Sequence, residues 1–225
     1  MNSSVILLVF ALCYGMVFLA TWISRRDNSN RLFNTNGEPA SSTVKLFGLH
    51  IAGIFWLGLV PLFFFKQTAI ALFSGTGVPG LYWWLAYSVA FVLIALTGFR
   101  SGSQIQIRQS NPNILSGKLV NLYFPVRILF VSAYEFFFRG ILLFDLITRL
   151  GMYPAVIIST GLTVLIHVFT NKKEMWGCVP FGIILSAFCI SIHAVWPAIA
   201  IHIVLSLAYE LPPVTRFFTQ LKPAK

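Results

Sequence analysis

Long apolar runs are the feature that most limits what this chain can fold into. Of its 225 residues, 57% are hydrophobic and only 10% are charged, whereas a soluble domain carries about 25% charged residues. A helix needs about 20 apolar residues to cross a bilayer, and seven runs approach that length. They cover residues 4–23, 45–65, 80–99, 121–147, 153–170, 177–193 and 195–210. The sequence therefore predicts an all-α transmembrane helix bundle of about seven spans, forming a single membrane domain over residues 1–225.

The basic residues fall almost entirely on one side of the predicted spans. The formal net charge is +10. With the N-terminus outside, twelve basic residues face the inside, and two, Lys66 and Arg149, face the outside. The inner ones are Arg25, Arg26, Arg31, Lys45, Arg100, Arg108, Lys118, Lys172, Lys173, Arg216, Lys222 and Lys225. This bias predicts an N-out, C-in topology and gives no indication of nucleic-acid binding. Attraction of the 24–45 loop to anionic lipid headgroups is the lesser alternative.

Polar side chains inside the spans are concentrated in the second half of the chain. They are Glu135 and Arg139 in 121–147; Ser159, Thr163 and His167 in 153–170, with Asn171 directly after this run; and His202, Ser206 and Glu210 in 195–210. Within each span, successive members are four residues apart and therefore share one helix face. Hydrocarbon cannot satisfy polar groups, so we expect the three faces to point at a shared interior.

Glu135, His167 and His202 also agree in their expected depth. At about 1.5 Å per residue, Glu135 lies roughly 14 Å and His202 roughly 12 Å from the inner surface. Taken singly, these residues have plainer explanations, because a Glu–Arg pair can hold a bundle together and an intramembrane His commonly bonds a neighbouring helix. One Glu and two His on converging faces together predict a functional site.

These residues resemble the motifs of the CPBP intramembrane proteases, also called the CAAX-processing and bacteriocin-processing endopeptidases. The family motif EExxxR corresponds to YEFFFR, Tyr134 to Arg139; FxxxH corresponds to TVLIH, Thr163 to His167; and HxxxN or HxxxD corresponds to HIVLS, His202 to Ser206. The resemblance covers about residues 120–210. Residues 1–119 are then three additional transmembrane spans with polar loops.

The resemblance implies hydrolysis of a peptide bond within or beside the membrane. Tyr134 stands where the family usually has its first Glu, so the role of general base passes to Glu135, the only carboxylate of the cluster. This change rotates the base by about 100° around the helix. His167 is expected to help orient the attacking water, and Arg139 to hold Glu135 or line the cavity.

The remaining motif positions are expected to support this chemistry. His202 and Ser206 would donate hydrogen bonds to the oxyanion of the tetrahedral intermediate. Ser206 replaces the usual Asn or Asp, and Thr163 replaces the usual Phe. Each motif therefore keeps its ionisable core but loses one partner.

No cofactor is expected, although zinc remains an alternative. One Glu and two His can ligate zinc, but the spacing is not HExxH and the three residues come from three helices. Two other function classes also stay open: a catalytically degenerate relative that binds or protects a membrane partner, and a small proton-coupled transporter. The expected partners are membrane lipids and a membrane-associated protein or peptide substrate. The expected location is a bacterial inner (plasma) membrane, with the site toward the cytoplasm.

Overall fold

The computed structural model describes residues 2–25, 31–108, 116–169 and 172–220. Asn171, Arg26, Lys222 and Lys225, which entered the predictions above, lie outside these ranges. The described residues form helices joined by short turns, with one isolated bridge between Phe33 and Pro39 and no strand among them. The predicted all-α fold is confirmed.

The helices follow one another along the chain with two π-helical segments, η1 and η3, inside them. They are α1 (Ser3–Arg25), α2 (Thr43–Gly53), η1 (Ile54–Leu59), α3 (Val60–Phe64), α4 (Lys66–Ser74), α5 (Leu81–Ser103), α6 (Gly117–Glu135), η3 (Phe136–Leu142), α7 (Leu143–Leu150), α8 (Met152–His167), α9 (Lys172–Ile192) and α10 (Trp196–Gln220).

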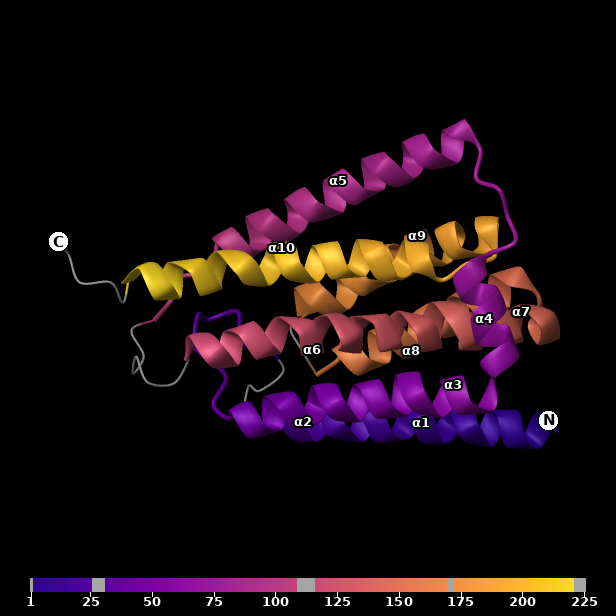
Figure 1. Cartoon of the computed structure of the whole chain (residues 1–225), viewed down its shortest axis with the longest axis horizontal. Helices are drawn as coiled ribbons and strands as arrows, with labels where there is room; N and C mark the ends of the chain where they lie inside the picture. Colours follow the sequence, from indigo (N-terminus) through magenta and orange to yellow (C-terminus); the bar gives the residue numbers. More distant parts are fainter. Residues whose placement is uncertain (1, 26–30, 109–115, 170–171, 221–225) are drawn as a thin grey trace.

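Five stretches of the described chain are long and apolar enough to cross a membrane. They are Ser3–Ser24, Thr43–Phe64, Leu81–Ser103, Lys172–Ile192 and Trp196–Gln220. The shorter apolar helix α8 and the continuous α6–η3–α7 helix bring the set to the predicted seven. The two ends of the chain lie at opposite ends of the bundle (Figure 1), as an odd number of crossings requires. The chain is a multi-pass integral membrane protein.

The α6–η3–α7 helix lies in the middle of the bundle, between the layer of α1, α2 and α3 and the layer of α9 and α10 (Figure 1). All seven residues of η3 are buried, including Phe136, Phe137 and Phe138. The Phe run therefore packs in the core and does not face lipid. Because this central helix is enclosed by other helices, it can carry Arg127, Glu135 and Arg139 without placing a charge in hydrocarbon.

Helix α10 continues ten residues past its predicted end at Glu210, to Gln220. The prolines at positions 212 and 213 lack N–H groups, so the carbonyls of Ala208 and Tyr209 lose their helical partners. Helix α5 packs closely at this point, since a Cβ on Gly102 would lie only 2.1 Å from the Tyr209 carbonyl oxygen. A small residue in α5 thus lets the two helices approach where the prolines remove two hydrogen bonds from α10.

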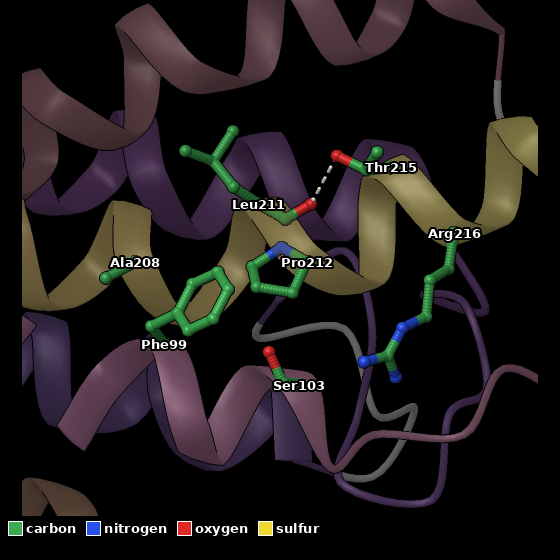
Figure 2. A pocket seen from close by; sticks show the side chains of 7 residues that line it. All are labelled: Phe99, Ser103, Ala208, Leu211, Pro212, Thr215 and Arg216. Atoms are coloured by element: carbon green, nitrogen blue, oxygen red, sulfur yellow. Dashed lines mark hydrogen bonds between the residues drawn. The ribbon is translucent and has the colours of Figure 1, made fainter. Parts of the chain in front are cut away.

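A crevice of about 360 Å³ lies beside this contact, between α5 and α10. Figure 2 shows its lining, with the Thr215 hydroxyl donating to the Leu211 carbonyl at 2.9 Å. The lining residues are Phe99, Ser103, Ala208, Leu211, Pro212, Thr215 and Arg216. None of the predicted site residues contributes to it.

Residues 31–42, which we name the cap, fold over the end of the bundle where α6 begins and α10 ends. Ala40 N–H donates to the Leu32 carbonyl at 2.8 Å and closes a tight turn. The side chains of Leu32 and Phe33 are buried in a cluster with residues of α6 and α10. The cap is therefore a packed part of the structure.

Candidate active site

Glu135 and His202 meet in the interior of the bundle. The Nδ1 atom of His202, on α10, is hydrogen-bonded to Oε1 of Glu135, at the end of α6. The Glu135 side chain is completely buried, whereas 16% of the His202 side chain is exposed. With Nδ1 engaged to the carboxylate, Nε2 is the ring nitrogen left to reach a substrate or a water molecule. The partly exposed His202 is thus the edge from which Glu135 can be approached.

Arg139 holds the second oxygen of the same carboxylate. Its Nε lies 3.5 Å from Glu135 Oε2, an ion-pair distance, and its Nη1 donates to the Thr163 hydroxyl at 3.1 Å. The guanidinium fits because α9 carries glycine at position 182, where a Cβ would lie 2.8 Å from Arg139 Nη2. The predicted pair of Glu135 and Arg139 is therefore present, and Thr163 is joined to it.

The π-helical segment η3 is fixed by the polar face of α8. The Ser159 hydroxyl donates to the Phe138 carbonyl at 2.8 Å, and the Thr163 hydroxyl donates to the Ser159 carbonyl at 2.9 Å. A π-helical turn changes the i→i+4 bonding of a helix and frees groups for such partners. The face predicted from four-residue spacing in α8 points at the Glu135–Arg139 segment.

Tyr134 contacts both histidine rings of the predicted site. Its ring centroid is 6.4 Å from that of His167, in a stacked arrangement, and 5.8 Å from that of His202, edge to face. The buried Tyr134 hydroxyl has no hydrogen-bond partner among the described residues. Tyr134 is therefore close to the Glu135–His202 pair, and His167 approaches that pair across the tyrosine ring.

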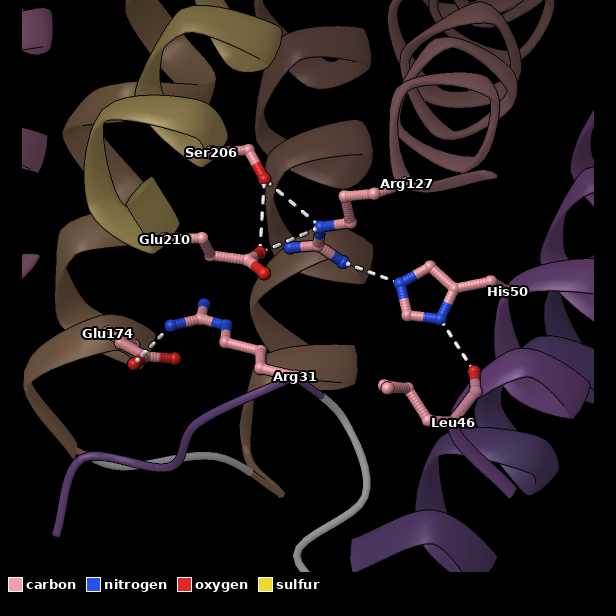
Figure 3. A network of polar contacts seen from close by, with 7 residues as sticks. All are labelled: Arg31, Leu46, His50, Arg127, Glu174, Ser206 and Glu210. Carbon is pink, nitrogen blue, oxygen red and sulfur yellow. Dashed lines mark hydrogen bonds and ion pairs between the residues drawn. The ribbon is translucent and has the colours of Figure 1, made fainter. Parts of the chain in front are cut away.

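A second layer of buried polar residues lies two helical turns away on the same helices, α6 and α10. Figure 3 shows Arg127 at its centre: Nε is 3.1 Å from Glu210 Oε1 and donates to the Ser206 hydroxyl at 3.0 Å. Nη1 lies 3.2 Å from Nε2 of His50, on α2. Ser206 also donates to Glu210 at 3.4 Å. Ser206 is thus bonded within this second layer.

The hydrogen bonds of His50 define its protonation. Nδ1 lies 2.7 Å from the Leu46 carbonyl, which can only accept, so Nδ1 carries the proton. Nε2 faces a guanidinium, which can only donate, so Nε2 is unprotonated. His50 is a neutral imidazole that accepts from Arg127, and it links α2 to the central helix.

Four-residue spacing does not predict this second layer. It gives Glu210 only as the end of a polar face, and neither Arg127 nor His50 belongs to a predicted polar face. One signal was present in the sequence: Arg127 precedes Glu135 by eight residues, and Glu210 follows His202 by eight. His50 had no comparable signal, because its partner lies far away along the chain.

The cap contributes a further ion pair beside the second layer. Arg31 Nη1 lies 2.9 Å from Glu174 Oε1 at the start of α9, and its guanidinium is 4.7 Å from the centre of the Tyr209 ring. Figure 3 shows this pair next to Glu210. Polar residues therefore extend from the cap through the second layer to Glu135.

The described residues contain no group of three His, Cys, Asp or Glu side chains placed to hold a metal ion. The Glu135–His202 contact supplies two such groups, and His167 stands beyond Tyr134. That the site acts without a metal ion remains a prediction, which a chelation experiment can test.

The comparison with protein families gives one match, described as type II CAAX prenyl endopeptidase Rce1-like, over residues 117–208. The comparisons with curated proteins and with solved structures gave no match. The matched segment runs from the start of α6 to α10 and includes Glu135, His167 and His202. Residues 117–208 are thus the Rce1-like part of this chain, and its predicted resemblance to the CAAX-processing proteases is confirmed.

Proposed function

We propose that this protein is an intramembrane endopeptidase that cleaves a membrane-associated protein or peptide with a water molecule activated by Glu135. The observation that carries the proposal is the contact between the buried Glu135 carboxylate and the His202 imidazole. It joins two motifs 67 residues apart in the chain. Nucleophile activation requires such a carboxylate in a site from which bulk water is largely excluded.

The reaction follows from the groups around Glu135. The water oxygen attacks the carbonyl carbon of the scissile peptide bond, while Glu135 takes the proton of that water. The Tyr134 hydroxyl, and His202 Nε2 in the protonated imidazole, would donate hydrogen bonds to the negative oxygen of the intermediate. The C–N bond then breaks, and Glu135 returns the proton to the leaving amine. Arg139 keeps the carboxylate in place.

Three finer assignments belong to the same proposal. His167, across Tyr134, would help to orient the substrate or the water. Ser206 would support the oxyanion only through a rearrangement of its bonds to Arg127 and Glu210. The division into a core at residues 120–210 and additional spans at 1–119 stays a prediction, as do the N-out topology and a bacterial inner membrane with the site toward the cytoplasm.

The test is cleavage by the purified chain in liposomes. The substrates are a prenylated peptide ending in a CAAX sequence and an unprenylated membrane-anchored peptide. We expect Glu135→Gln to reduce kcat roughly 100- to 10,000-fold, the usual contribution of general base catalysis. His202→Ala should lose about 100-fold or more, as removal of an oxyanion donor does. Asp145→Asn, a carboxylate on the same central helix outside the site, is the matched control and should retain wild-type activity.

Cleavage that is equal in wild type, Glu135→Gln and His202→Ala would refute the proposed chemistry. A chelator should leave cleavage unchanged, and loss of activity that zinc restores would show a metal enzyme instead.

One observation favours a second function. Glu135 has no exposed surface and is held by both Arg139 and His202, which also suits a purely structural clamp. A catalytically silent relative that binds a membrane partner would retain its cellular activity in the Glu135→Gln variant. The same variant, with its folding checked by thermal unfolding in detergent because the buried Arg139 loses its partner, therefore separates the two functions.

A further inference from the structure

The contacts between α6 and α10 share one antiparallel register. Arg127 pairs with Glu210, and eight residues later on α6, Glu135 pairs with His202, eight residues earlier on α10. Eight residues are about 12 Å of helix. Both contacts therefore exist only if the two helices keep the same axial position relative to each other.

Apolar side chains beyond the second layer continue the same register. Tyr123 lies four residues before Arg127, and Val214 lies four residues after Glu210. Val120 and Phe217 lie three residues further in each direction, and all four are buried in one cluster. Apolar packing of this kind is not directional. A slide by one helical turn, about 5.4 Å, exchanges one set of apolar contacts for another.

A buried charge responds to such a slide differently. The side chains of Arg127 and Glu210 are only 12% and 5% exposed, and a buried charge left without its partner is strongly destabilising. Arg127 is also bound to His50 of α2, so α6 is held by a third helix at the same level. A single buried polar contact is known to select one register among apolar alternatives.

We propose that Arg127 and Glu210 are positioning residues, which set the axial register at which Glu135 meets His202. The catalytic meaning of this pairing rests on the proposed function, whereas the register itself does not. Neither residue needs to touch the substrate. Their effect on the reaction is transmitted through the position of α10 relative to α6.

A double substitution separates positioning from stability. Replacing a buried ion pair by apolar residues of similar volume is often neutral or stabilising, so Arg127→Met/Glu210→Met should yield a folded protein. Its thermal stability should fall only by the cost of leaving the buried His50 Nε2 without its donor. The double substitution removes the ion pair between Arg127 and Glu210 and leaves the apolar packing between α6 and α10. Arg127→Lys keeps the charge and is the conservative variant.

The register is measured by disulfide cross-linking of the full-length protein in liposomes. The three native cysteines, Cys13, Cys178 and Cys189, are first replaced by Ala. Phe217→Cys is then combined with Val120→Cys, which is in register, or with Ser116→Cys or Phe124→Cys, one turn to either side. Losing about 1 kcal/mol of preference changes a population ratio about fivefold. We expect the in-register yield to fall by about that factor in the double Met variant, and a shifted cross-link to appear.

Kinetics supply the second measurement, with the peptide that the wild type cleaves. A misplacement on the order of 1 Å can cost about 100-fold in rate, so we expect kcat of the double Met variant to fall roughly 10- to 100-fold. KM should change less than about twofold, because substrate binding is not altered. Arg127→Lys should retain the in-register cross-link and most of kcat. Arg149→Met, which breaks an exposed ion pair on α7, is the matched control and should change neither quantity.

Each combination of cross-linking and kinetic results either supports or overturns the proposal. A shifted cross-link together with a lower kcat supports the proposal. An unchanged cross-link pattern in the double Met variant overturns it, whatever the activity. A shifted cross-link with unchanged kcat also overturns it, because the register would then not matter to the reaction. If the wild type cleaves no peptide while the cross-link shifts, the register stands and the proposed function fails.

Discussion

The two polar layers on α6 and α10 differ in where their partners come from. In the first layer, Glu135, Arg139 and His202 all lie within the Rce1-like segment 117–208. In the second, Arg127 lies within that segment, but Glu210 lies beyond it and His50 comes from α2. The layer that carries the proposed chemistry thus lies within the Rce1-like segment. The second layer also includes residues from outside that segment.

The layers also differ in which buried atoms lack a hydrogen bond. Around Arg127, the guanidinium, Ser206 and the His50 ring form a connected set of hydrogen bonds, and the buried atom of this layer without a partner among the described residues is an acceptor, Glu210 Oε2. Around Glu135, the atoms without a partner include donors, the Tyr134 hydroxyl and the Arg139 Nη2. A connected polar network rigidifies a core, whereas unbonded donors beside a carboxylate suit a site that binds a further group. Substitutions in and around each layer can test this contrast.

The largest effect is expected in the first layer. Arg139→Met leaves the buried Glu135 without its cation and should destabilise the protein by about 3–5 kcal/mol. Thermal unfolding in detergent measures this. The double variant Arg139→Met/Glu135→Met removes both charges and should recover most of the loss. A single variant as stable as the wild type would show that Glu135 does not depend on Arg139.

The next effect concerns the contact that supports the end of α10. Gly102→Ala places a Cβ against the Tyr209 carbonyl, which is backbone and cannot move aside alone. We expect a loss of about 1–3 kcal/mol, as for overpacked positions. Gly161→Ala, at a helical position with open space around it, should instead stabilise the protein by about 0.5–1 kcal/mol. Equal effects of the two substitutions would show that α5 does not rest on α10 at Gly102.

A smaller effect is expected where α8 fixes the π-helical segment. Ser159→Ala removes the hydroxyl that donates to the Phe138 carbonyl and should cost about 1 kcal/mol. The matched control is Ser74→Ala, whose exposed hydroxyl bonds only within its own helix at 2.9 Å. Thermal unfolding of both variants tests the contact, and indistinguishable midpoints would contradict it.

The smallest effect on stability is expected at the cap. The cap should instead affect how easily a small reagent reaches the interior of the bundle. Arg31 and Glu174 are 25% and 21% exposed, and such pairs contribute less than about 1 kcal/mol. Arg31→Ala should nevertheless loosen the cap over α9. Cys178 is buried one turn after Glu174 and is a native reporter.

With Cys13 and Cys189 replaced by Ala, Arg31→Ala should increase the rate at which a small thiol reagent labels Cys178. Arg149→Ala, which removes an ion pair with Asp145 on α7, is the control. A labelling rate equal to that of the control would mean that the cap does not limit access to Cys178.

Much of this molecule could be predicted from its sequence. Apolar length specifies spans, because a bilayer leaves few alternatives to a helix. Four-residue spacing places Glu135 with Arg139 and orders Ser159, Thr163 and His167 on one face, because 3.6 residues per turn is a local property. The contact of Glu135 with His202 was expected from motif resemblance and shared depth.

Only the tertiary structure decided the rest. The extent of α10 beyond Glu210 depends on α5, which accommodates the break at Pro212 and Pro213. The pairing of Arg127 with Glu210 and His50 depends on three helices distant in sequence, and local spacing carries no information on which helix faces which. The sequence by itself determined which segments enter the membrane and which faces are polar, because bilayer thickness and helical period fix both. The tertiary structure decided the partner of each polar group, because a buried charge is satisfied only by what packing brings within reach.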